Sequence, residues 1–140
     1  MGATRRLYFY LILLFFPVVS IASVGQAQQE DAAIAAGRER FVDACAFCHG
    51  LSGQGNGMAA TMLEQQPSDL TLLSKNNEGK FPLAEVYRVI DGRGPGSSHG
   101  VRDMPVWGDV WKKNVPEQYA DYYVRGRILE LILYLDSIQQ

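Results

Sequence analysis

The chain has 140 residues, of which 47% are hydrophobic and 20% charged, with 13 basic and 15 acidic side chains and a formal net charge of −2. This composition is typical of one small folded domain. It excludes a disordered chain and a strongly basic nucleic-acid-binding protein.

The first 27 residues have the pattern of an export signal. Arg5 and Arg6 precede an uncharged, apolar stretch from Leu7 to Val24, and small residues follow at Gly25-Gln26-Ala27. We expect a signal peptide over residues 1–27, a periplasmic location, and a mature domain over residues 28–140 with 11 basic and 15 acidic residues, a net charge of −4. The apolar stretch approaches the length of a membrane-spanning helix, so a retained membrane anchor is the alternative.

Apolar residues at helical spacing predict three helices in the mature chain, over residues 31–45, 83–90 and 116–138, with a shorter candidate over 58–65. Gly92 is expected to end the second helix. Asn114 and Pro116 are expected to begin the last one, and Ser68 can cap a turn at residues 67–70. Because no segment alternates with period two, the predicted fold class is all-α.

The first and last predicted helices both have an apolar stripe. Gly37, in the middle of the first stripe, costs about 1 kcal/mol relative to alanine in a helix, so another helix is expected to approach the backbone there. The last helix is the candidate partner. The two stripes consist of Ile34, Gly37, Phe41 and Ala44, and of Ile128, Leu131, Leu135 and Ile138, the second widened by Leu129, Ile132, Leu133 and Tyr134.

The run Cys45-Ala46-Phe47-Cys48-His49 follows the first predicted helix. This spacing is that of a c-type haem attachment site. Each thiol can bond to one vinyl group of the same porphyrin, and the adjacent imidazole can bind the iron as proximal ligand. The predicted cofactor is therefore one covalently attached haem c with its iron.

Two other kinds of site use the same residue types. A closed zinc site would need both cysteines and both histidines of the chain, Cys45, Cys48, His49 and His99. A redox dithiol of the thioredoxin type would need a βαβ context, which the sequence lacks. The spacing favours haem over both.

The sixth position of a haem iron decides between electron transfer and ligand binding. Met104 is the best-placed candidate, on the loop Asp103-Met104-Pro105-Val106-Trp107-Gly108, which separates two predicted helices. Met58 and Met62, four residues apart on a candidate helix, are expected to pack, and His99 to be a loop residue. Trp107 can help to wall the haem pocket.

With both motifs placed, the chain resembles class I cytochromes c of the bacterial mono-haem branch, whose methionine loop reads Met-Pro-Val-Trp-Gly. The resemblance implies thioether bonds at Cys45 and Cys48 and iron ligation by His49 and Met104. It also implies a small helical domain wrapped around the haem, in which Gly37 and Phe41 contact the last helix near Tyr134. The carbonyl of Pro67 would accept a hydrogen bond from the His49 ring.

The function expected from these features is one-electron transfer between redox proteins, with no substrate turned over by the chain itself. The partners would be periplasmic redox enzymes or membrane respiratory complexes, with no nucleic acid, and the protein would meet the membrane only if the N-terminal segment is retained. Two alternatives stay open. One is the haem subunit of a periplasmic dehydrogenase or oxidase complex, and the other is a gas-binding module in which Met104 is labile.

Overall fold

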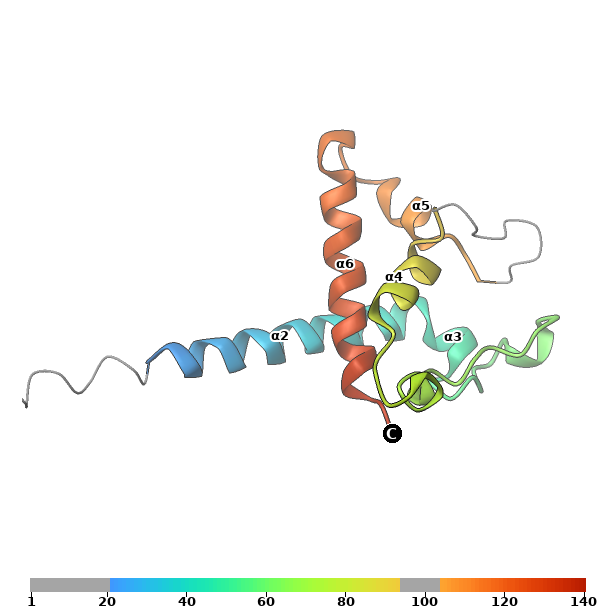
Figure 1. The fold of residues 1–140 in the computed structure, drawn as a ribbon. Helices are drawn as coiled ribbons and strands as arrows, with labels where there is room; N and C mark the ends of the chain where they lie inside the picture. The colour runs from blue at the N-terminus through green and yellow to red at the C-terminus, as the bar shows by residue number, and fades with distance from the viewer. Residues whose placement is uncertain (1–20, 94–103) are drawn as a thin grey trace, which may run out of the picture. The chain divides into compact units, whose positions relative to one another are not determined.

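The computed structural model describes residues 21–93 and 104–140, with side chains from Gln28 onward, and these residues form helices and loops with no strand (Figure 1). The predicted all-α class is therefore confirmed. The chain divides into two units, residues 1–32 and 33–140, and the second contains the candidate site. The α-helices are α2 (Ile21–Ala44), α3 (Ala46–His49), α4 (Leu83–Asp91), α5 (Trp107–Lys112) and α6 (Glu117–Ser137), and three short 3-10 helices are η1 (Ala60–Met62), η2 (Leu70–Leu72) and η3 (Lys75–Asn77).

The core of residues 33–140 is built on α6, which packs against both α4 and α5 (Figure 1). Val124, Ile128 and Leu131 on α6 are completely or almost completely buried, and Val86 and Ile90 join them from α4. Only one face of α6 is covered in this way. Leu129 and Leu133, which were expected to widen the apolar stripe, are instead 48% and 38% exposed.

The C-terminal part of α2 contacts α6 at a close approach of the two backbones. Gly37 lies against the Glu130 carbonyl, where a side chain would not fit, and against the Cβ atom of Tyr134. The rings of Phe41 and Tyr134 meet with centroids 5.3 Å apart, and Arg40 forms an ion pair with Glu130. The expected contact of Gly37 and Phe41 with the last helix near Tyr134 is confirmed.

Helix boundaries follow the sequence at some ends and depart from it at others. Gly92 ends α4 in the left-handed conformation, with φ of 67°, as predicted. Pro116 is the N-cap residue of α6, with no capping side chain, so the expected role of Asn114 is wrong. At η2 the Asp69 carboxylate, and not Ser68, accepts the capping hydrogen bond from the Thr71 amide, at 2.9 Å.

The candidate helix over residues 58–65 is reduced to the single turn η1. Met58 and Met62 are 77% and 74% exposed, so their expected packing is also wrong. The physical reason is that the backbone here forms hydrogen bonds with α3 in place of those of a helix. The Ala59 amide donates to the Phe47 carbonyl at 3.0 Å, and the backbone at Leu63 is extended.

The N-terminal export signal falls mostly on residues 1–20, outside the described residues, and its cleavage or retention stays a prediction. In the described ranges 21–93 and 104–140, no helix has the length and apolar character needed to cross a membrane.

Candidate functional site

The cysteine and histidine motif lies at the junction of α2 and α3. Cys45 separates the two helices, and the amide of His49 donates to the carbonyl of Cys45 at 2.9 Å. Because this bond spans four residues, Cys48 and His49 lie about one helical turn beyond Cys45, on the same side of the backbone. Local helical structure alone therefore brings the two thiols and the imidazole together.

The glycine-rich loop that follows the motif fixes the end of α3. The amide of Gly55 donates to the His49 carbonyl at 2.8 Å, and the amide of Gly57 donates to the Cys48 carbonyl at 3.0 Å. The last carbonyls of a helix have no partner within the helix and must find one elsewhere. The loop supplies these partners and so holds the motif rigid.

The same loop brings a distant backbone carbonyl to the His49 ring. Gly55, with φ of 74°, lies directly against the Pro67 carbonyl, and the next carbonyl, that of Ser68, is 3.1 Å from Nδ1 of His49. A carbonyl can only accept, so Nδ1 carries the proton and Nε2 has a free lone pair. The acceptor is therefore Ser68 and not the expected Pro67, whose carbonyl is covered by Gly55.

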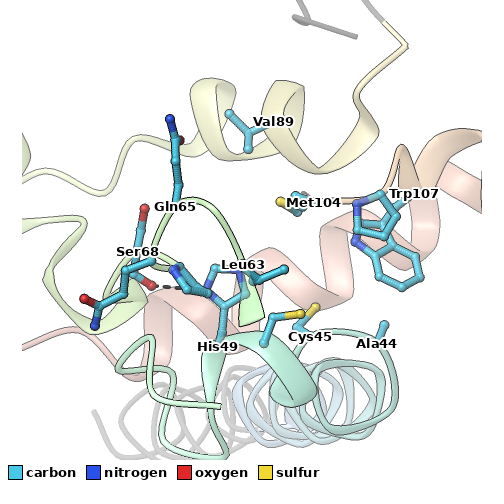
Figure 2. Close-up of a pocket in the computed structure, with 13 residues that line it drawn as sticks. Ala44, Cys45, His49, Leu63, Gln65, Ser68, Val89, Met104 and Trp107 are labelled. Atoms are coloured by element: carbon cyan, nitrogen blue, oxygen red, sulfur yellow. Dashed lines mark hydrogen bonds between the residues drawn. The ribbon is translucent and has the colours of Figure 1, made fainter. Parts of the chain in front are cut away.

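A cleft of about 240 Å³, open to solvent, lies beside the motif. Figure 2 shows Cys45 and His49 on one side of it and Met104 on the other, with Trp107 at one end. Apolar side chains and a few uncharged polar ones share the lining. Its residues are Ala44, Cys45, Cys48, His49, Leu63, Gln65, Gln66, Pro67, Ser68, Val89, Met104, Pro105 and Trp107.

Met104 is positioned by the short helix α5, which the sequence analysis did not predict. Val106 packs against Gly92 at the end of α4. Two residues later, Gly108 is buried so closely against Asp91 and Arg93 that any side chain there would overlap both. The residues after Met104 thus fasten the loop to α4 and leave Met104 at the cleft.

Burial shifts the pKa values of His49 and Cys45 in opposite directions. Desolvation lowers the pKa of His49 below its usual value, although the hydrogen bond to Ser68 acts in the opposite direction, so the ring is neutral at neutral pH. Burial, with a smaller effect of the nearby Cys48, raises the pKa of Cys45 to about 12. A redox dithiol needs a readily formed thiolate, so this environment disfavours the thioredoxin-type alternative.

The structure thus brings Cys45, Cys48, His49 and Met104, all chosen from the sequence, to one cleft. Trp107 lines the cleft as expected, whereas His99 lies outside the described residues. Sequence reasoning missed Leu63, Gln65, Gln66 and Val89 as lining residues. No spacing pattern marks them, because the first three lie in a loop and Val89 reaches the cleft only through the packing of α4.

The chemistry of the residues around the cleft suits a haem c. Two thiols can form thioethers, a neutral imidazole and a thioether sulfur are the axial ligands of cytochromes c, and apolar side chains suit the porphyrin faces. Within residues 21–93 and 104–140, no group of three or more His, Cys, Asp or Glu side chains is placed to hold a metal ion directly. The zinc alternative also needs His99, which lies outside these residues. Comparison with protein-family models, with curated proteins and with solved structures finds no match to this chain.

Proposed function

We propose that the chain is a class I type c cytochrome, a periplasmic one-electron carrier with a single covalently attached haem. The observation that carries the proposal is the convergence of Cys45, Cys48, His49 and Met104 on one cleft from segments more than fifty residues apart in sequence. An attachment motif alone would account for the first three residues. Met104, which faces them from a distant segment, supplies the second axial ligand expected of an electron carrier.

Haem c, when bound, supplies a one-electron couple between ferric and ferrous iron. In the proposed arrangement Cys45 and Cys48 hold the porphyrin by thioether bonds, and His49 presents Nε2. The Ser68 carbonyl keeps the His49 ring in the required tautomer and increases its basicity as a ligand.

The residues of the opposite wall would raise the reduction potential of the haem. A thioether ligand from Met104 favours the ferrous state and raises the reduction potential. Val89 and Trp107 would place apolar surface against the haem, and a less polar environment disfavours the more highly charged ferric state. Because both ligands are held by packed elements, little rearrangement would accompany each electron transfer.

The direct test replaces Met104 by alanine in protein matured with haem-attachment machinery. We expect the weak ferric absorption band of methionine sulfur on iron to disappear and the reduction potential to fall on the order of 0.1 V, a fraction of the ≈0.8 V that axial ligands span. Met62→Ala is the matched control, because Met62 is 74% exposed and does not line the cleft. It should leave both the band and the potential unchanged.

The opposite result would count against the proposal. If the Met104→Ala spectrum and potential equal those of the unsubstituted protein, Met104 is not a ligand and the carrier proposal loses its main support. The sixth position would then be open or held by His99, and rapid carbon monoxide binding by the reduced protein would indicate an open position.

A further inference from the structure

A stack of aromatic rings and one guanidinium group lies behind the cleft wall that includes Met104. On α5 the rings of Trp107 and Trp111 stack with centroids 5.2 Å apart and planes inclined by 29°. From α6 the guanidinium of Arg127 lies 5.8 Å from the Trp111 ring and 4.8 Å from the Tyr123 ring. Since Trp107 lines the cleft, an unbroken series of contacts connects Arg127 to the cleft.

Among the described residues, Arg127 contacts these two rings and forms no ion pair. Its Nε atom is buried and has no hydrogen-bond partner among the described residues. Acidic residues of α4, α5 and α6 pair with other cations, Asp91 and Asp121 with Arg93 and Asp109 with Lys112. A buried polar atom without a partner is unfavourable, and a long side chain can usually avoid it by reaching solvent. The aromatic contacts therefore provide the compensating attraction.

Helix α5 depends on such contacts for its position. It has only six residues, which is too short for a helix to be stable without packing. Near its start α5 is fixed where Gly108 meets Asp91 and Arg93, and near its end where Trp111 meets Arg127. Met104 lies three residues before the first residue of α5, so any displacement of α5 would move its sulfur relative to His49.

We propose that Arg127 is a positioning residue for Met104. By holding Trp111, and through it Trp107, it keeps α5 and the Met104 segment against the cleft. The inference rests on the proposed function, in which Met104 is the sixth ligand of a haem iron. Loosening the stack should make Met104 easier to displace by an external ligand while the haem stays attached.

The test measures imidazole binding to the ferric holoprotein, in which imidazole competes with Met104. We expect Arg127→Leu to bind imidazole about tenfold more tightly, since it loses two cation–π contacts at once. Arg127→Lys should give an intermediate affinity, because lysine keeps the charge but not the planar group. Arg88→Leu is the matched control and should leave the affinity unchanged, since Arg88 pairs with the exposed Glu85 on α4 and does not line the cleft.

A second control separates positioning from general destabilisation. Phe41→Leu alters the fully buried contact of α2 with α6, and it should lower the denaturant midpoint but leave the imidazole affinity within twofold. If Arg127→Leu fails to mature, Trp111→Phe weakens the same stack and should also tighten imidazole binding. Affinities of Arg127→Leu and Trp111→Phe equal to that of Arg88→Leu would overturn the positioning role.

The proposed function and this inference can fail separately. Unsubstituted protein with attached haem and the methionine band supports the proposed ligands, whatever the Arg127 variants do. Attached haem without that band overturns ligation by Met104, and the inference falls with it.

Discussion

Gly37 is the residue at which a single methyl group should have the largest effect on the packing of α2 against α6. A Cβ atom there would overlap the Glu130 carbonyl, which belongs to the backbone of α6 and cannot move alone. We expect Gly37→Ala to lower the free energy of unfolding by about 1–3 kcal/mol, because overpacking outweighs the better helix propensity of alanine. Chemical denaturation monitored by circular dichroism measures the change.

Gly126 on α6 provides the control for this prediction, since a Cβ atom there meets nothing within 4 Å. Gly126→Ala should be neutral or stabilise the protein by up to about 1 kcal/mol. If the two substitutions have equal effects, the close approach at Gly37 does not limit the packing.

The residues of the cleft were predictable from the sequence where they form a local motif, and less so where loops decide the geometry. Cys45, Cys48 and His49 form a local motif, and helical hydrogen bonds alone bring them together. The acceptor for the His49 ring was placed at Pro67 but is Ser68, 19 residues from His49. Its identity depends on how Gly55 meets the chain at Pro67, which no local pattern encodes.

Helix α5 connects the methionine loop to the rest of the core, so its attachment to α4 can be tested directly. In Gly108→Ala the new methyl group would overlap the Asp91 and Arg93 side chains and approach the Asp91 carbonyl at 2.7 Å. We expect α5 to shift and the methionine band to weaken or disappear, with the haem still attached through Cys45 and Cys48. The band and covalent attachment are read from spectra before and after denaturation.

Val110→Ala is the control for that substitution, because Val110 lies on α5 but is 39% exposed. It should keep the band at full strength. A full-strength band in Gly108→Ala would show that the close packing of α5 on α4 does not determine the place of Met104.

Long helices were predicted from the sequence better than short ones. The long periodic stripes of α2 and α6 gave helices of the right type, and the stripe of α4 ended at Gly92 as expected. Helix α5 was missed and residues 58–65 were assigned to a helix that is absent. Both are short segments whose conformation is set by tertiary contacts, and propensity is a weak guide there.

At the scale of the whole molecule, the cleft should make stability depend on the haem. An unfilled closed cavity lowers the free energy of unfolding by about 24 cal/mol per Å³. For the 240 Å³ of this cleft the upper value is about 6 kcal/mol, and the true loss is smaller because the cleft is open to solvent. We expect protein produced without haem attachment to unfold at lower denaturant concentration and to bind an apolar fluorescent dye. Identical unfolding curves with and without haem would contradict this prediction.

The all-α architecture followed from the sequence because no segment alternates with period two. The sequence predicted which residues face each other across the cleft but not its full lining. Its walls come from four separate segments, which are the motif, the loop at residues 63–68, α4 and the Met104 segment. The export signal concerns residues 1–27 and stays a prediction.

The most direct measurement is an absorption spectrum of the oxidised and reduced protein, matured in a periplasm with haem-attachment machinery. The proposed function predicts haem that stays bound after denaturation, together with the weak ferric band of methionine sulfur on iron. Haem that is released on denaturation would contradict attachment at Cys45 and Cys48. Bound haem without the methionine band would contradict ligation by Met104 and favour ligand binding over electron transfer.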